Sequence, residues 1–380
     1  LRATNSMPAA MRQLPSREGK VRSMSFSPIH RHLAIGGEDC TMIVLDLGRG
    51  DITLSHHDDA ENSSSDDSAI TPVIGEIERE DRIHAVEYSP SGQYIAVAGF
   101  DGMCAIVNAS TMELVTEITR SGLILCVAWH PSGSMIAIGG SDKEAAVLDT
   151  DSWEVLGEIQ RHGTIQCLSW SPQDYNTNNQ RNTTATKATA SWSTSENSNK
   201  SPRSSNEKEG LLAVGGSDGK VAIIDMDTKS IAKEVSLFQL QHQQEELRRS
   251  RSRKSRQKSP QDSVSNDIKS CRVNSVSWCP DGSYISICGS NGVVIIVETR
   301  SFAVVQEVIR TSNLTCIAWQ PMNGKYLTVG GDDHTVAVLK TGIMVGEDAM
   351  SPDRQSIDES MSKDSIRSPS GWVLSEDFEL

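Results

Sequence analysis

A segment of sixteen residues recurs six times along the chain, and this repeat constrains the fold more than any other feature. Each copy has an apolar stretch rich in small residues, a turn centred on glycine, and a second stretch rich in β-branched residues, which is the pattern of a β-hairpin. A fold assembled from copies of one small unit is therefore predicted. The copies begin at His32, Tyr94, Met135, Leu211, Tyr284 and Tyr326.

Two further strands flank most of these hairpins. The strand before each hairpin ends in an aromatic residue, usually followed by proline, and the intervals between these aromatic residues are 62, 41, 41, 108 and 41 residues. The basic period is therefore 41, and the two long intervals carry insertions. A short fourth strand follows most hairpins, as in "ELVTEI" and "EVLGEI", so each unit is predicted to be a four-stranded antiparallel sheet. The aromatic residues are Phe26, Tyr88, Trp129, Trp170, Trp278 and Trp319.

This pattern resembles the WD-repeat family over roughly residues 20–342, because its period lies within the 40–45 residues expected for that family. The resemblance implies an all-β fold, a β-propeller of four-stranded antiparallel blades, with six repeats visible and six or seven blades in the closed ring. Two family features are missing. Pairs such as Leu45-Asp46 replace the Trp-Asp dipeptide, and no Gly-His precedes the first strands. The blades are therefore expected to depend mainly on apolar packing between neighbouring sheets.

The sequence outside the repeats is divided as follows. Residues 1–19 are predicted to be a flexible N-terminal segment, and residues 343–380 an acidic, serine-rich tail whose end, Gly371–Leu380, is alternatively the edge of a further blade. Polar composition predicts disorder in the insertions, because such segments bury too little apolar surface to repay the entropy of ordering. These insertions cover about residues 51–71, 173–209 and 239–270.

One turn, Gly215-Gly216-Ser217-Asp218-Gly219, fits the G-x-S-x-G pattern of a hydrolase nucleophile. The other five repeats carry Glu, Phe, Ser, Ser and Asp at the position of Ser217, and "KVAIID" after the turn is typical of a strand rather than a helix. We therefore interpret the stretch as a structural turn and expect no catalytic residue in it. Glycine at the second position is expected to serve a positive φ or a close backbone approach. These turn glycines are Gly37, Gly99, Gly140, Gly216, Gly289 and Gly331.

The net charge of −14 argues against a general nucleic-acid-binding surface, and no apolar run is long enough to cross a membrane. The eight cysteines include no C-x-x-C pair, so we expect no metal and no cofactor. Cys126, Cys167 and Cys316 recur at one repeat position and are predicted to be small buried core residues. Acidic turn residues are predicted to form a partner-binding face: Glu38, Asp39, Asp101, Asp142, Asp218, Asp332 and Asp333.

The third insertion contains a basic loop, in which lysine and arginine alternate with serine. Its basic residues are Arg248, Arg249, Arg251, Arg253, Lys254, Arg256 and Lys258, and its candidate phosphorylation sites are Ser250, Ser252, Ser255 and Ser259. The loop is interpreted as a phosphorylation switch, a nuclear-localisation signal, an RNA-contacting tract or a solubilising segment. Because WD-type topology places it on the face of the hairpin turns, we hypothesise that it folds over the acidic turn residues until phosphorylation or a basic partner displaces it.

The function favoured by these observations is a non-catalytic scaffold that binds other proteins within a complex, in the cytoplasm or the nucleus. Fold alone supports only this much. Two alternatives remain open: a propeller enzyme, which requires a catalytic set that departs from the repeat, and a trafficking or exchange-factor propeller tethered to a membrane by a segment outside this chain.

Overall fold

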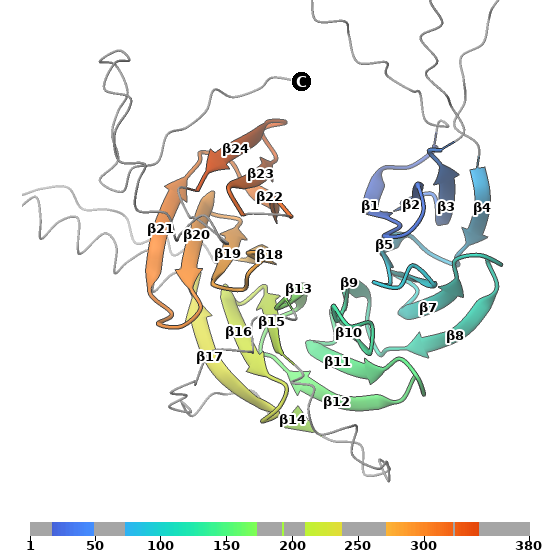
Figure 1. The fold of residues 1–380 in the computed structure, drawn as a ribbon, viewed down its shortest axis with the longest axis horizontal. Coiled ribbons are helices and arrows are strands. Elements are labelled where there is room, and N and C mark those ends of the chain that lie inside the picture. The colour runs from blue at the N-terminus through green and yellow to red at the C-terminus, as the bar shows by residue number, and fades with distance from the viewer. Residues whose placement is uncertain are drawn as a thin grey trace, which may run out of the picture. The chain divides into compact units, whose positions relative to one another are not determined.

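Figure 1 shows a computed structural model of the protein, which describes residues 17–48, 73–172, 192–193, 210–237, 271–321 and 324–341. The chain forms two compact units, residues 1–124 and 125–380. Strands in antiparallel sheets make up both units, which confirms the predicted all-β fold of propeller blades.

Unit 1 contains two four-stranded sheets whose strands pair in chain order (Figure 1). Sheet 1 consists of β1 (Val21–Phe26), β2 (His32–Gly37), β3 (Thr41–Asp46) and β4 (Val73–Glu78). Sheet 2 consists of β5 (Ile83–Tyr88), β6 (Tyr94–Gly99), β7 (Met103–Asn108) and β8 (Leu114–Thr119).

Sheets 3 to 6 belong to unit 2, which begins within β9. Sheet 3 consists of β9 (Ile124–Trp129), β10 (Met135–Gly140), β11 (Glu144–Asp149), β12 (Val155–Gln160) and a short fifth strand, β14 (Trp192–Ser193). Sheet 4 consists of β13 (Ile165–Trp170), β15 (Leu211–Gly216), β16 (Lys220–Asp225) and β17 (Ser230–Ser236). Sheet 5 consists of β18 (Val273–Trp278), β19 (Tyr284–Gly289), β20 (Val293–Glu298) and β21 (Val304–Ile309). Sheet 6 has three described strands, β22 (Leu314–Trp319), β23 (Tyr326–Gly331) and β24 (Val336–Lys340).

The six sheets correspond to the six repeats, and each predicted hairpin forms in the same register. In sheets 1, 2, 4, 5 and 6 the aromatic residue that ends the first strand pairs with the second residue of the hairpin, as Tyr88 does with Ile95 and Trp278 with Ile285. The fifth strand of sheet 3 lies within the insertion at residues 173–209 and pairs with the edge of β12, Glu158 with Ser193 and Ile159 with Trp192. An outer blade edge can therefore accept a strand from another part of the chain.

The core of each unit lies between successive sheets. In unit 1, Ala34, Met42 and Val44 of sheet 1 pack against Ile83, Val86 and Tyr88 of sheet 2. In unit 2, one apolar cluster joins sheets 3 and 4, another joins sheets 4 and 5, and a third joins sheets 5 and 6. The hairpin strands of sheets 4 and 5 are rich in small and β-branched residues because sheets of unit 2 cover both of their faces.

Tryptophan side chains also connect neighbouring sheets of unit 2 through hydrogen bonds. The indole Nε1 of Trp170 donates to the carbonyl of Ala128 at 2.9 Å, Trp278 donates to Ser169 at 3.0 Å, and Trp319 donates to Ser277 at 3.1 Å. Each acceptor lies one residue before the aromatic residue of the preceding sheet. The recurring tryptophan therefore fixes the register between blades as well as filling the core.

Candidate functional site: the hairpin turns

The turn between the second and third strands of each sheet is closed by a side-chain cap. In sheet 4, Oδ1 of Asp218 accepts the backbone N–H of Lys220 at 3.1 Å, and Asp101 of sheet 2 accepts that of Met103 at 3.0 Å. This is an Asx turn, in which a short polar side chain replaces a backbone acceptor. The same bond is made at 3.2 to 3.4 Å by Asp39, Asp142, Asn291 and Asp333.

Two turn positions have different backbone requirements. The residue after the cap lies in the left-handed region, with φ of 72° at Gly219 and 66° at Lys143, so glycine is favoured there without being obligatory. Four of the six predicted turn glycines are required for a close backbone approach instead: Gly37, Gly99, Gly289 and Gly331. A Cβ at Gly37 would lie 2.6 Å from the carbonyl oxygen of Lys20, and one at Gly331 would lie 2.9 Å from that of Asn313. Of the two roles predicted for these glycines, close approach is therefore the one observed.

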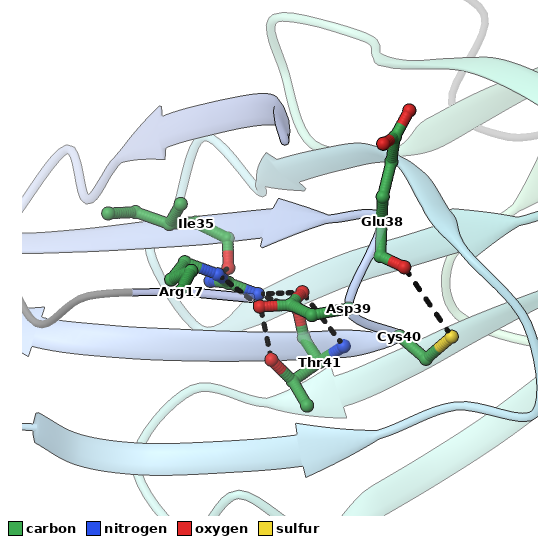
Figure 2. Close-up of polar contacts among 6 residues, drawn as sticks. All are labelled: Arg17, Ile35, Glu38, Asp39, Cys40 and Thr41. Atoms are coloured by element: carbon green, nitrogen blue, oxygen red, sulfur yellow. Dashed lines mark hydrogen bonds and ion pairs between the residues drawn. The ribbon is translucent and has the colours of Figure 1, made fainter. Parts of the chain in front are cut away.

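In four of the six sheets the capping aspartate is clamped by an arginine whose side chain is at most 16% exposed. In sheet 1, Nε of Arg17 donates to Oδ2 of Asp39 at 2.6 Å, and one terminal nitrogen donates to Oδ1 of Asp39 at 2.5 Å (Figure 2). The same terminal nitrogen donates to the carbonyl oxygen of Thr41 at 2.5 Å, and the other donates to that of Ile35 at 3.0 Å. The side chains of Arg17 and Asp39 are only 9% and 13% exposed. A planar guanidinium with five donors fits this bidentate geometry, which an ammonium group cannot reproduce.

The clamp is repeated in sheet 2. Arg79 donates to Oδ2 of Asp101 from Nε at 2.9 Å and from a terminal nitrogen at 2.7 Å, and its other terminal nitrogen donates to Glu117 on β8 at 2.6 Å. The segment entering the sheet, the hairpin turn and the outer strand therefore meet at one guanidinium. Asp101 is the most buried carboxylate of the set, with 3% of its side chain exposed.

Unit 2 contains two further clamps. Arg161 pairs with Asp218 at 3.4 Å and with Glu234 on β17 at 3.0 Å, and 3% of its side chain is exposed. Arg310 pairs with Asp333 at 3.0 Å. Each arginine lies just before the first strand of its sheet, so the clamp connects the entry of the blade to its hairpin turn.

These contacts lower the pKa of three turn carboxylates. Hydrogen bonds from Arg17 lower the pKa of Asp39 below its ordinary value of 3.8. For Asp333, hydrogen bonds from Ser312 and then from Arg310 lower the pKa in the same direction. Arg22 lowers the pKa of Glu38 through a hydrogen bond on the surface of sheet 1. Charge in the turns is therefore balanced largely within the protein.

The predicted partner-binding face is thus a set of turn residues with internal roles. Four aspartates cap their turns and pair with an arginine: Asp39, Asp101, Asp218 and Asp333. Asp142 caps its turn, and Glu38 pairs with Arg22. Asp332 is exposed and accepts a hydrogen bond from the amide of Asn313 at 2.6 Å. Binding of a partner by these residues stays a prediction. The recurring arginine was missed at the sequence level, although its spacing of 22 residues from the aspartate is the same in sheets 1 and 2.

Ser217 occupies an ordinary turn position. Its backbone N–H donates to the carbonyl of Thr164 at 2.9 Å, and strand β16 follows at Lys220 instead of a helix. Asp218 beside it is committed to Arg161. Within the described ranges no hydrogen bond joins Ser217 to a histidine, so the G-x-S-x-G match has the geometry of a hairpin turn.

The recurring cysteines differ in exposure. Cys126 and Cys167 are buried, as predicted, and burial raises the pKa of the Cys167 thiol well above its ordinary value. The prediction is wrong for Cys316, which is exposed. Its strand belongs to sheet 6, and in the part of the chain that the structure describes no further sheet follows to cover that face. The repeat position fixes the orientation of the side chain, whereas the neighbouring sheet determines its burial.

The basic loop lies outside the described residues. This applies to Arg248, Arg249, Arg251, Arg253, Lys254, Arg256 and Lys258, and to Ser250, Ser252, Ser255 and Ser259. Among the residues that are described, no helix has the length and hydropathy needed to span a membrane, and no three histidine, cysteine or acidic side chains gather as metal ligands would.

Two family models match the chain. The model of the anaphase-promoting complex subunit 4 WD40 domain matches residues 119–173 and 237–322, which contain β9 to β13 and β18 to β22. A model described as WD domain, G-beta repeat, matches residues 10–46 and 74–108, which contain the first three strands of both sheets in unit 1. No curated protein matches the chain. The second match includes the clamped turns at Asp39 and Asp101, whereas the first includes the capped turns at Asp142 and Asn291.

Proposed function

The chain belongs to the WD-repeat family, and on this premise we propose that it is a non-catalytic scaffold that holds other proteins together in a complex. WD repeats generally serve protein–protein interaction. The finer proposal concerns how this chain does so: a constant set of caps and clamps holds the hairpin turns, and the residues between them recognise partners.

The observation that supports this proposal is the contrast between constant and variable turn positions. The capping residue is aspartate or asparagine in all six turns, and arginine fixes it in four. The residue just before it is partly or fully accessible in every turn and varies: it is serine in three turns, acidic in two and phenylalanine in one. A surface of this kind suits recognition of several different partner groups, whereas catalysis requires one set of cooperating side chains. The variable residues are Glu38, Phe100, Ser141, Ser217, Ser290 and Asp332.

Phe100 is the variable residue best suited to anchor a partner. It is the one aromatic residue among the six, it is partly exposed, and its ring stacks on His84 with centroids 5.7 Å apart and an interplanar angle of 14°. A ring held rigid by stacking loses little conformational entropy on binding, and aromatic residues are enriched among interface hot spots.

Membership of a multiprotein complex forms part of the proposal. One of the two matching family models describes a subunit of the anaphase-promoting complex, which is itself an assembly. We infer only that this chain likewise functions as a subunit of a larger assembly, in the cytoplasm or the nucleus.

Affinity purification followed by mass spectrometry tests the scaffold. We expect the intact chain to recover a reproducible set of proteins, and Phe100→Ser to lose some members of that set. Leu114→Ser is the matched control, because Leu114 is exposed and apolar in the same sheet but lies away from the turn. Recovery of no protein, together with ester or peptide hydrolysis that Ser217→Ala abolishes, would overturn the proposal.

Phosphorylation of the basic loop is proposed to regulate partner binding. Each phosphate adds nearly two negative charges, so a few phosphates cancel much of the positive charge of the loop. Because arginines already pair with four of the turn aspartates, the exposed Asp332 is the carboxylate best suited to attract the loop.

A comparison of loop variants tests this regulation. Replacing Ser250, Ser252, Ser255 and Ser259 by glutamate should change the recovered proteins in the same way as deleting residues 241–263, and replacement by alanine should not. Salt-sensitive partner binding that is unchanged by the deletion contradicts the regulatory proposal. Recovery of RNA that depends on the loop would instead support the RNA-contacting interpretation.

A further inference from the structure

Sheet 3 contains a strand that is not part of the repeat. Strand β14 comes from between β13 and β15 of sheet 4, and it pairs antiparallel with β12, the outer strand of sheet 3 (Figure 1). In the ranges that the structure describes, the outer strands β4, β8, β17 and β21 of four other sheets pair on one side only. The outer edge of sheet 3 is therefore able to take up an added strand.

The resident strand uses only part of the available edge. A bulge interrupts β12 at Leu156, because Gly157 pairs with Val147 of β11 and Val155 pairs with Leu148. The regular part of β12 is thus the four residues Gly157–Gln160. Strand β14 pairs with the two in the middle, and no other described strand pairs on that side with the first or the last of the four. A longer strand could pair with all four.

The short length of β14 makes it replaceable. Trp192 and Ser193 are its only two residues, paired with Ile159 and Glu158. Ordering each residue of a strand costs conformational entropy, and two residues form few backbone hydrogen bonds that offset this cost. A segment that pairs with all four residues of the regular part forms more hydrogen bonds with the same edge. Such a segment can therefore displace β14.

The edge also has a side-chain preference. Ile159 is 2% exposed and belongs to the apolar cluster between sheets 3 and 4, which also contains Ile231 of β17. Residues that pair across strands share a face, so the position opposite Ile159 borders this cluster. A large apolar residue at that position extends the cluster. The sequence of this chain places Trp192 there.

Two neighbouring positions add to this preference. Like charges directly opposite one another in a sheet are destabilising, so an acidic residue is excluded opposite Glu158. Alternate residues of a strand share a face, so the position opposite Gly157 lies on the same face as the one opposite Ile159. Glycine within a strand often marks a close approach of another backbone, and a β-branched residue opposite it favours the extended conformation.

We propose that the outer edge of β12 is a strand-addition site for an extended segment of a partner protein, and that Trp192–Ser193 occupies it until this segment displaces them. The segment has a large apolar residue opposite Ile159, a non-acidic residue opposite Glu158 and a β-branched residue opposite Gly157. In this mode of recognition the backbone hydrogen bonds provide affinity, and alternate side chains provide specificity. The site uses no residue of the hairpin turns, so it is independent of the recognition proposed there.

A segment of a different protein is favoured over a second copy of this chain. The identical segment of a second copy would form the same two pairs with Glu158 and Ile159, and would gain nothing over the strand already present. A foreign segment that matches the whole of Gly157–Gln160 gains further pairs.

Binding of a peptide in trans provides the first test. The double variant Trp192→Pro with Ser193→Pro removes the resident strand, because proline has no N–H to donate to β12. Thr183→Pro with Thr184→Pro is the matched control, since it places the same substitutions in the same insertion outside β14. The probe is a fluorescein-labelled peptide, KATASWSVSENS, which is residues 187–198 with Thr194→Val.

Fluorescence anisotropy measures the affinity of the probe. We expect the variant without the resident strand to bind the peptide at least about tenfold more tightly than the wild type, because the edge of the wild type is open only for a minor fraction of the time. The control variant should bind like the wild type. A peptide with proline at the positions of Trp192 and Ser193 should bind neither. Circular dichroism should show the same fold for both variants.

Hydrogen exchange followed by mass spectrometry locates the binding surface. Without peptide, the amides of residues 155–160 should exchange at least about fivefold faster in the variant without the resident strand than in the wild type, because that side of β12 is then open to solvent. Saturating peptide should restore their protection. The amides of residues 114–119, which form the outer strand of sheet 2, should exchange at one rate throughout.

Affinity purification from the native cell tests the partner. The variant without the resident strand should recover at least one protein in greater amount than the wild type. Excess unlabelled peptide should release this protein, and the proline-containing peptide should not. Phe100→Ser in the same background should leave it bound, which separates the edge of β12 from the hairpin turns.

Four results would overturn the proposal. The first is no peptide binding to the variant without the resident strand, and the second is binding that leaves the exchange of residues 155–160 unchanged. The third is recovery of the same proteins in the same amounts by variant and wild type, or of additional proteins that the peptide does not release. The fourth is a dimer of the variant that the peptide dissociates, which would identify a second copy of the chain as the occupant.

Discussion

Replacing Arg79 by methionine tests the buried clamp most directly. Arg79 donates two hydrogen bonds to Asp101 and one to Glu117, and its side chain is 11% exposed. Removing one member of a buried ion pair costs about 3–5 kcal/mol, because the remaining charge is left buried without compensation. Glu117 is 33% exposed and can be solvated, so the penalty comes mainly from Asp101. We expect the free energy of unfolding to fall by about 3 kcal/mol.

Urea denaturation followed by circular dichroism measures this loss, and Arg22→Met is the matched control. Arg22 also pairs with a turn carboxylate, Glu38, but its side chain is 43% exposed. Exposed pairs contribute little, so the control should unfold at nearly the wild-type urea concentration.

The double variant Arg79→Met with Asp101→Asn separates the buried charge from other effects. Asparagine keeps an oxygen that can accept the N–H of Met103, but it carries no charge. We therefore expect the double variant to be more stable than Arg79→Met alone, with about half of the loss recovered. Equal stability of Arg79→Met and Arg22→Met, or no recovery in the double variant, would refute the reasoning.

Three further predictions concern other groups. The hydroxyl of Tyr88 is buried and has no hydrogen-bond partner within the described ranges, so Tyr88→Phe should raise the free energy of unfolding by roughly 1 kcal/mol in the same urea assay. The pKa values of Asp39 and Asp333 are lowered in the folded state. Their contribution to stability is therefore complete above about pH 4 and is lost as the pH falls further. The urea midpoint should fall less steeply with acidification in Asp39→Asn than in the wild type. Iodoacetamide should modify Cys316 in the native protein and leave Cys126 unmodified until the chain unfolds, as peptide mass spectrometry can show.

The hairpins could be predicted from the sequence because the information that specifies them is local. A glycine-centred turn between two β-branched stretches specifies a hairpin without reference to the rest of the chain, and six copies in register make chance agreement improbable. The fourth strands were predictable for the same reason, including β4, which begins at Val73 after a long insertion.

Burial could not be predicted in the same way. Phe26 and Trp170 occupy the same position in the repeat, yet one is 68% exposed and the other 6%. Cys316 and Cys167 differ similarly. In each pair the local sequence is nearly the same, and the difference comes from whether another sheet lies against that face. This information is absent from any window of the sequence as short as one repeat.

The arginine clamps could be predicted from the sequence only in part. Arg17 and Arg79 each precede their aspartate by 22 residues, so the spacing was visible in the sequence. In sheet 4 the insertion separates Arg161 from Asp218 by 57 residues, which hides the same pair. A conserved geometry was therefore present without a conserved spacing, and only the folded sheet brings the two residues together.

The two roles of the turn residue can be separated by comparing sheets 4 and 5. Asn291 caps its turn through its amide oxygen at 3.3 Å, as Asp218 does at 3.1 Å through a carboxylate. A neutral amide keeps the cap but cannot form an ion pair, so the cap is the common requirement of the turn. The ion pair adds a second constraint, because it ties the segment before the first strand to the hairpin. The Gly-His pair expected before the first strands of WD repeats is missing from this chain. In sheets 1, 2, 4 and 6 a guanidinium with five donors ties the entry segment to the turn.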